Sequence, residues 1–167
     1  MAVKKKIVVI DDEEDLCFLV KENLEAAGEF EVVAVTDPLT AETVCKQHKP
    51  ALVLLDVVMP TRKGSDVAKA LKKDPQTKSI PIIIMSGLGE MVYFKDKAKW
   101  DWLPNRPIVR QRGEVIDEKV PRRAAEAYGV DAYISKPFAT PDLVEAINYL
   151  LLPASEKDPD AYEPGRF

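Results

Sequence analysis

Residues 52–60 read LVLLDVVMP, a nearly unbroken apolar run with a single carboxylate, Asp56, set into it. A continuous run of β-branched and other apolar residues of this length is typical of a strand buried on both faces of a parallel sheet. An ionised carboxylate beside such a core is costly unless a cation compensates it or the strand ends at an open edge. The stretch therefore predicts a buried parallel strand that ends in a compensated or solvent-facing charge.

The size and composition of the chain are those of one ordinary globular domain. It has 167 residues, of which 46% are hydrophobic and 31% charged, and its formal net charge is -4. This acidic balance argues against a nucleic-acid partner, whose phosphates favour a basic surface. No apolar stretch approaches the roughly 20 residues that a membrane span requires. We therefore expect a cytoplasmic protein with neither a nucleic-acid nor a membrane partner.

The cysteines and the single histidine exclude several kinds of site. Cys17 and Cys45 show no CxxC spacing, and we expect both thiols to fill apolar space rather than to serve redox chemistry. His48 is the only histidine in the sequence. A His-rich metal site or a Ser-His-Asp triad is therefore not expected.

Apolar strands alternate with amphipathic helices along the chain. Strands are predicted at residues 6–10, 30–36, 51–55, 80–85 and 132–135. Helices are predicted after Asp11 up to Gly28, after Asp37-Pro38, at residues 65–73, near 122–128, and after Thr140-Pro141. Such alternation produces right-handed crossovers and an α/β fold. We expect a doubly wound, five-stranded parallel sheet with the flavodoxin-like strand order 2-1-3-4-5.

The helices carry apolar stripes that we expect to face this sheet. In the first helix the stripe comprises Leu16, Leu19, Val20, Leu24 and Ala27. In the second it comprises Ala41, Val44 and Cys45, in the third Val67, Ala70 and Leu71, and in the last Leu143, Ile147 and Leu150.

Polar side chains follow four of the predicted strands at the points where those strands end. They are Asp11, Asp12, Asp56, Ser86 and Lys136. Each has an ordinary interpretation by itself: the acidic pair could complement a helix dipole, and Asp56 could be a turn residue. Lys136 could be a surface lysine, and Ser86 a hydroxyl at the end of a strand. Because the carboxyl ends of parallel strands meet at one edge of a sheet, we expect these side chains to lie close together.

Three clustered carboxylates require compensation. At about 4 Å and an effective dielectric near 20, each pair repels by roughly 4 kcal/mol. Either a cation sits among the carboxylates or some of them are protonated. A site with few carboxylates and room for water suits Mg²⁺ better than Ca²⁺.

These pieces together resemble a two-component response-regulator receiver domain of the CheY-like kind. The matching segments are Asp11-Asp12-Glu13 after the first strand, LLDVVMP around Asp56 with Gly64 beyond it, IIIMSG with Ser86, and AYISKPF with Tyr133, Lys136 and Pro137. The resemblance covers residues 6–90 and about 118–152. It implies a domain that works in phosphorelay signal transduction.

The resemblance also implies roles for these residues. Asp56 would be the phosphoacceptor, forming an aspartyl phosphate from a phosphohistidine on a histidine kinase or histidine phosphotransfer protein. Asp11, Asp12, Asp56 and the backbone carbonyl of Val58 would hold Mg²⁺. Lys136 would pair with a phosphoryl oxygen, Ser86 would donate to another, and the Lys136-Pro137 peptide would be cis. Such a protein catalyses its own phosphoryl transfer and dephosphorylation without being a turnover enzyme.

Tyr133 has two interpretations. It matches the aromatic switch of the family, which turns inward when the Ser86 hydroxyl moves toward the phosphoryl group. Alternatively, it is a tyrosine half-buried on an edge strand with its hydroxyl in water.

The stretch between Ser86 and Lys136 is longer than the family pattern. We expect residues 1–152 to form the receiver domain with an insertion at about 88–117, and residues 153–167 to be a flexible tail. Residues 107–116 could form a small β-ribbon within the insertion. The insertion, which contains both tryptophans, either carries a surface for a partner or a second copy, or packs onto its own domain.

Three functional hypotheses follow. The first is a stand-alone phosphorylation-switched receiver with an unidentified downstream protein target. The second is a phosphorylation-independent pseudo-receiver that acts through the insertion. The third is a Mg²⁺-dependent aspartyl phosphatase of the haloacid-dehalogenase type. That family places its nucleophile on the first strand with a second acid two residues later, whereas Asp11 is followed by Asp12 and then Glu13.

Overall fold

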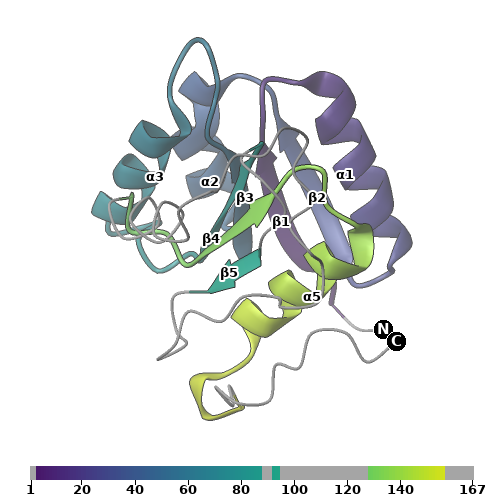
Figure 1. Ribbon diagram of the computed structural model, residues 1–167. Coiled ribbons are helices and arrows are strands. Elements are labelled where there is room, and N and C mark those ends of the chain that lie inside the picture. Colours follow the sequence, from purple (N-terminus) through teal and green to yellow (C-terminus); the bar gives the residue numbers. More distant parts are fainter. Residues whose placement is uncertain (1–2, 88–91, 95–127, 157–167) are drawn as a thin grey trace, which may run out of the picture.

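A central sheet separates two layers of helices. The computed structural model describes residues 3–87, 92–94 and 128–156. The strands are β1 (Lys5–Ile10), β2 (Phe30–Val35), β3 (Leu52–Asp56), β4 (Ile82–Ser86), β5 (Val92–Phe94) and β6 (Ala132–Ser135). The helices are α1 (Glu14–Ala26), α2 (Ala41–His48), α3 (Gly64–Lys73) and α5 (Thr140–Leu151), with short 3-10 helices at Pro38–Thr40 and Ala154–Glu156. Figure 1 shows α1 and α5 on one side of the sheet and α2 and α3 on the other.

The sheet confirms the predicted α/β topology. Its strand order is β2-β1-β3-β4-β6-β5, and every neighbouring pair is parallel except β5 and β6. Since β6 is the predicted fifth strand, the doubly wound order 2-1-3-4-5 is correct. The antiparallel strand β5 was not predicted, because three residues are too few to carry a periodic pattern.

Both faces of the sheet are buried, which explains the continuous apolar runs. Side chains alternate between the two faces of a strand. One core cluster joins Ile7, Val9, Leu52 and Leu54 to residues of α1 and α5. The other joins Val8, Ile10, Val53 and Leu55 to residues of α2 and α3. Cys17 lies in the first cluster and Cys45 in the second, so the expected burial of both thiols is confirmed.

The inward faces of two helices differ from the predicted stripes. In α1 the buried residues are Cys17, Val20 and Leu24, whereas the side chain of Leu19 is 54% exposed and Ala27 is also exposed. The buried stripe follows a spacing of three and then four residues from Cys17, which places Leu19 on another side of the helix. In α3, Ala68 is buried and Ala70 only partly so. The expectations for Leu19 and Ala27 were wrong, and Ala68 takes the place expected for Ala70.

The start of β4 is later than predicted. Pro81 has no N–H to give to a neighbouring strand, and the N–H of Ile80 donates to the carbonyl of Thr77 in a turn. The strand therefore begins at Ile82.

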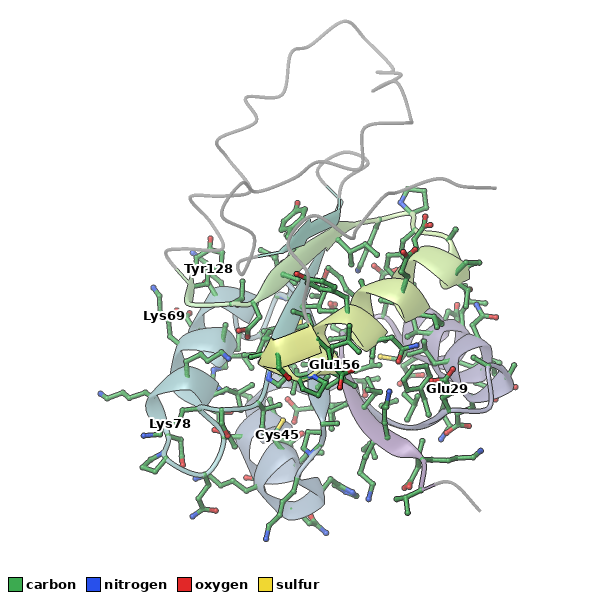
Figure 2. The ribbon with its side chains drawn as sticks, turned by 90° about the horizontal axis from the view of Figure 1, so that it is seen from below. Glu29, Cys45, Lys69, Lys78, Tyr128 and Glu156 are labelled. Carbon is green, nitrogen blue, oxygen red and sulfur yellow. The ribbon has the colours of Figure 1, made fainter. Side chains whose placement is uncertain are left out.

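The chain returns to the sheet after the insertion through contacts with α3. The Nζ atom of Lys69 lies 6.0 Å from the centre of the Tyr128 ring, and Figure 2 shows the two residues close together. A carboxylate oxygen of Asp131 accepts hydrogen bonds from Lys72 (2.8 Å) and from the N–H of Ile82 (2.9 Å). These contacts fix the entry to β6 against both α3 and β4.

Several sequence predictions lie outside the described residues. They are the β-ribbon at 107–116, nearly all of the helix near 122–128, and the tail beyond residue 156. In the described ranges, no helix is long and apolar enough to cross a membrane.

Candidate functional site

Four strands place polar residues at one edge of the sheet. Asp11 directly follows β1, Asp56 ends β3, Ser86 ends β4, and Lys136 directly follows β6. These strands run parallel to one another, so their carboxyl ends share an edge. The side chain of Ser86 lies outside the described part of the structure.

Three carboxylates and one ammonium form a compact cluster at this edge. Asp11, Asp12 and Asp56 each offer a carboxylate oxygen within 4.8 Å of the other two. The Nζ atom of Lys136 lies 2.6 Å from Oδ2 of Asp11 and 2.8 Å from Oδ1 of Asp56. Asp11 and Asp56 are buried, and Asp12 is partly exposed. The structure therefore confirms the predicted clustering of Asp11, Asp12, Asp56 and Lys136.

This geometry contradicts the ordinary interpretations of Asp56 and Lys136. Asp56 belongs to β3 rather than to a turn. Lys136 is not a surface lysine, because its side chain is only 18% exposed and contacts two carboxylates. Asp11 is fully buried two residues before the N-cap residue of α1, Glu13, where a carboxylate can also complement the helix dipole.

The turn between β1 and α1 fixes Asp11 in place. Its Oδ1 atom accepts a 2.9 Å hydrogen bond from the N–H of Glu13, and its main-chain carbonyl accepts one from the thiol of Cys17 at 3.3 Å. The other carboxylate oxygen is thereby directed toward Lys136. The contact from Cys17 could not be predicted, since the sequence marks this residue only as a core filler.

The β3–α3 loop, residues 57–63, follows Asp56 directly. Met59 is buried in the core that faces α2 and α3, whereas the side chain of Val58 is 77% exposed. The N–H of Gly64 donates to the carbonyl of Val57 at 3.0 Å, which closes the loop. A Cβ atom on Gly64 would overlap the main-chain carbonyl of Asp56. The start of α3 can approach the strand end only because residue 64 is glycine.

Burial and pairing set the charges of the cluster. Burial raises the pKa of Asp56, and hydrogen bonding to Lys136 offsets only part of that rise. Burial alone would lower the pKa of Lys136, but its hydrogen bonds to Asp11 and Asp56 outweigh this and raise it. The ammonium therefore stays protonated at neutral pH and compensates the two buried carboxylates.

The donor set fits Mg²⁺. Hard divalent cations prefer oxygen ligands, and a magnesium site commonly uses one or two carboxylates and keeps several waters. The cluster offers three carboxylates, one of them partly open to solvent.

Tyr133 and the Lys136-Pro137 peptide complete the predicted set. The peptide is cis, as expected. Tyr133 lies in β6, which is not the edge strand because β5 pairs with it, and its side chain is 4% exposed. The alternative of a half-buried tyrosine on an edge strand is therefore wrong, while the switch role stays a prediction.

The chain is similar to known response-regulator proteins. Residues 7–101 match the family model described as "Response regulator receiver domain". The chain is 32% identical over 146 residues to the phosphate regulon transcriptional regulatory protein PhoB of Rhizobium meliloti, a match that covers 87% of this chain and 52% of PhoB. It is 27% identical over 147 residues to the polar-differentiation response regulator DivK of Brucella anthropi, which covers 88% of this chain and 96% of DivK.

Solved structures show the same fold. The chemotaxis protein CheY4 of Vibrio cholerae superposes with a TM-score of 0.66 at 21% identity, covering 90% of this chain and 100% of CheY4. A CheY-like receiver domain protein from Methanospirillum hungatei gives a TM-score of 0.64 at 21% identity, covering 89% and 94%.

The family is established on this basis. The chain spans about half the length of the PhoB relative and nearly the whole of DivK. The family model that matches this chain is that of receiver domains, which favours the receiver hypothesis over a haloacid-dehalogenase-type phosphatase. The chain therefore belongs to the response-regulator receiver domain family of two-component signalling.

Proposed function

We propose that this receiver domain accepts a phosphoryl group on Asp56 and thereby switches its protein–protein contacts. The donor would be a phosphohistidine on a histidine kinase or a histidine phosphotransfer protein. One observation carries the proposal: the Lys136 ammonium bridges Asp11 and Asp56 beside Asp12, within a single oxygen-lined cluster. A pseudo-receiver that works without phosphorylation has no need of this arrangement.

The transfer itself would be an in-line displacement. A carboxylate oxygen of Asp56 attacks the phosphorus atom, and the phosphorus–nitrogen bond of the donor breaks. The electron pair of that bond stays on the histidine nitrogen, which takes up a proton from water to give a neutral imidazole. The product on this chain is an aspartyl phosphate.

Asp11, Asp12, Asp56 and the main-chain carbonyl of Val58 would hold Mg²⁺. When bound, this ion neutralises charge on the transferring phosphoryl group. Asp11 suits the role because its carboxylate is already fixed by the hydrogen bond from the Glu13 N–H.

Lys136 would exchange one partner for another during the reaction. In the unphosphorylated protein it neutralises Asp56, at a distance of 2.8 Å. Once Asp56 carries a phosphoryl group, the ammonium would pair with a phosphoryl oxygen instead. The Ser86 hydroxyl would donate to another phosphoryl oxygen, and Tyr133 would follow the movement of Ser86 as the conformational switch.

The proposal extends to the cellular role. The domain would catalyse its own phosphorylation and dephosphorylation without acting as a turnover enzyme, and it would work in the cytoplasm through a downstream protein target. Its net charge of -4 does not favour contact with nucleic acid. The insertion would supply a surface for a partner or for a second copy of the chain.

Intact-mass measurement tests the proposed function. The protein is incubated with a small phosphodonor such as acetyl phosphate, with Mg²⁺ or with EDTA, alongside Asp56→Asn. We expect one phosphoryl adduct on the wild type with Mg²⁺, and none with EDTA or on the variant. A wild type that binds Mg²⁺ but gains no adduct from any donor, including a phosphohistidine protein, would support the pseudo-receiver instead.

A further inference from the structure

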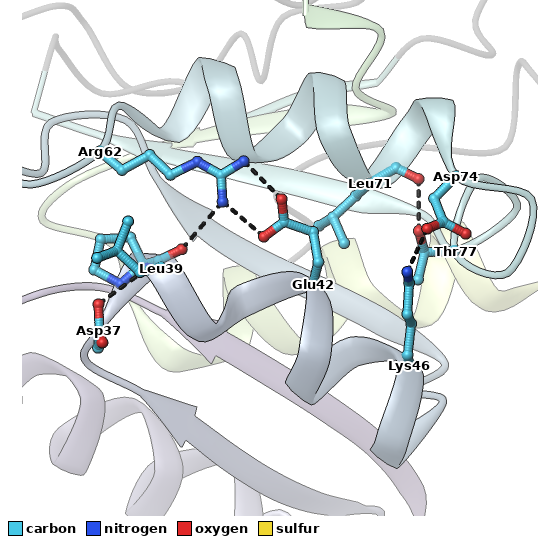
Figure 3. Close-up of polar contacts among 9 residues, drawn as sticks. Asp37, Leu39, Glu42, Lys46, Arg62, Leu71, Asp74 and Thr77 are labelled. Atoms are coloured by element: carbon cyan, nitrogen blue, oxygen red, sulfur yellow. Dashed lines mark hydrogen bonds and ion pairs between the residues drawn. The ribbon is translucent and has the colours of Figure 1, made fainter.

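Two ion pairs connect α2 to the two ends of α3 (Figure 3). At one end, Arg62 in the β3–α3 loop contacts Glu42 of α2. At the other, Lys46 of α2 contacts Asp74, directly after α3, at 2.6 Å. Both pairs connect α2 to a segment that flanks α3, but only the first includes a residue of the loop that follows Asp56.

Arg62 forms a bidentate ion pair, or fork, with Glu42. Nη1 of Arg62 donates to Oε2 of Glu42 at 2.7 Å, and Nη2 donates to Oε1 at 2.6 Å. Nη1 also lies 3.5 Å from the carbonyl oxygen of Pro38. The Arg62 and Glu42 side chains are only 23% and 25% exposed. A bidentate charge-assisted pair fixes orientation as well as distance, so this contact restrains the loop in more than one direction.

The position of this loop matters to the site because the loop follows Asp56 directly and contains Val58. It runs from Asp56 to Gly64, and Val58, whose carbonyl is a candidate metal ligand, has a solvent-exposed side chain that does not anchor it. Met59 anchors the middle of the loop in the core. Val57, next to Val58, also packs against that core, and Arg62 adds a side-chain anchor nearer α3, directed sideways onto α2.

We propose that Arg62 is a positioning residue for the metal side of the site. Its fork on Glu42 holds the β3–α3 loop so that the main chain at Val58 faces the carboxylates of Asp11 and Asp56. Loss of the fork lets the loop shift and weakens Mg²⁺ binding, although no ligand is removed. This inference rests on the proposed function, because it assumes that the carboxylate cluster binds Mg²⁺.

The chain supplies a matched control. Lys46→Met removes an ion pair of similar length between α2 and the residue that follows α3, at the end of α3 remote from Asp56. Arg62→Met removes the fork, and Arg62→Lys keeps the charge but cannot form two parallel hydrogen bonds with a carboxylate. Circular dichroism and thermal unfolding first establish that all three variants fold.

Isothermal titration with MgCl₂ then gives the dissociation constant for each folded protein. Loss of residues that orient metal ligands typically weakens binding by 10- to 100-fold, and we expect about tenfold for Arg62→Met, which acts indirectly. Arg62→Lys should show most of that loss, and Lys46→Met should stay within about twofold of the wild type. At saturating Mg²⁺, the rate of phosphorylation by acetyl phosphate should return close to that of the wild type in all variants.

The outcomes separate the inference from the proposed function. If the wild type binds Mg²⁺ and Arg62→Met binds it with the same affinity, the positioning role alone is overturned. Equal weakening in Arg62→Met and Lys46→Met would also overturn it, since the effect would then be one of general stability. Absence of Mg²⁺ binding by the wild type would overturn both the metal site and the inference.

Discussion

The Nζ atom of Lys136 donates a 2.6 Å hydrogen bond to Oδ2 of Asp11, which stands 125 residues earlier in the chain. The same ammonium lies 2.8 Å from Asp56. Two buried carboxylates this close to each other need a positive charge, and Lys136 supplies it within the protein. Lys136 is thus the resident counter-ion of the acidic cluster.

Replacing Lys136 with methionine should destabilise the protein most strongly when no metal is present. Removing one partner leaves buried carboxylates without compensation, a change that typically costs about 3 to 5 kcal/mol of unfolding free energy. Mg²⁺ would restore positive charge, so the loss should be smaller at saturating Mg²⁺. Urea unfolding of both proteins in EDTA and in MgCl₂ measures the difference. The same loss in the two buffers would contradict the counter-ion role.

Gly64→Ala should destabilise the fold despite the better helix propensity of alanine. In a helix interior alanine is favoured over glycine by about 1 kcal/mol, and at the first residue of α3 the gain is no larger. The added methyl group, however, would overlap the main-chain carbonyl of Asp56, and overpacking typically costs about 1 to 3 kcal/mol. We expect a net loss in chemical denaturation. Gly87→Ala is the control, since a Cβ atom there meets nothing within 4 Å. A Gly64→Ala protein more stable than the wild type would contradict the prediction, because the overlap with the Asp56 carbonyl would then be relieved without cost.

Both thiols should resist alkylation in the native protein. Burial raises the pKa of Cys17 to about 11 and that of Cys45 to about 12, and iodoacetamide reacts with the thiolate. Mass spectrometry at about pH 8 should show no adduct on the native chain and two on the denatured chain, which has two cysteines. Rapid labelling of the native protein would contradict the burial of these thiols.

The same thiols should make the fold sensitive to alkali. Their folded-state pKa values lie above the ordinary value of 9.0. Their contribution to stability is therefore complete below pH 9.0 and is lost as the pH rises toward 11 and 12. Cys45→Ala should show a shallower loss of unfolding free energy over that range than the wild type.

The Glu42–Arg62 pair should make part of the stability sensitive to acid. The hydrogen bond from Arg62 lowers the pKa of Glu42 below its ordinary value of 4.5. The pair therefore contributes stability above pH 4.5 that is lost as the pH falls through the lower folded-state pKa. Glu42→Gln should cost about 1 to 2 kcal/mol at neutral pH and progressively less in acid. An unfolding free-energy difference that does not change with pH would contradict this pairing.

The sheet and the acidic cluster could be predicted from the sequence because their signals are local and repeated. A short apolar run predicts each strand, and parallel strands bring their carboxyl ends to one edge of the sheet whatever the length of chain between them. Asp11, Asp56 and Lys136 could therefore be assigned to one site although they stand far apart in the sequence.

Features that depend on particular tertiary contacts could not be predicted. The fork between Arg62 and Glu42 spans 20 residues and matches no motif. Leu19 was predicted to be a core residue because it is apolar. In the structure α1 turns Cys17, Val20 and Leu24 toward the core, which leaves Leu19 exposed. Strand β5 exists through pairing with β6, whose partner residues lie some 40 positions later in the chain.

The most direct test of the central claim locates the phosphoryl group in the chain. The protein is incubated with acetyl phosphate and Mg²⁺, reduced with sodium borohydride, which converts an aspartyl phosphate to homoserine, then digested and sequenced by mass spectrometry. We expect homoserine at position 56 and at no other aspartate. Homoserine at Asp11 or Asp12, or an unmodified Asp56 in protein that carries a phosphoryl adduct, would contradict the assignment of Asp56 as the phosphoacceptor.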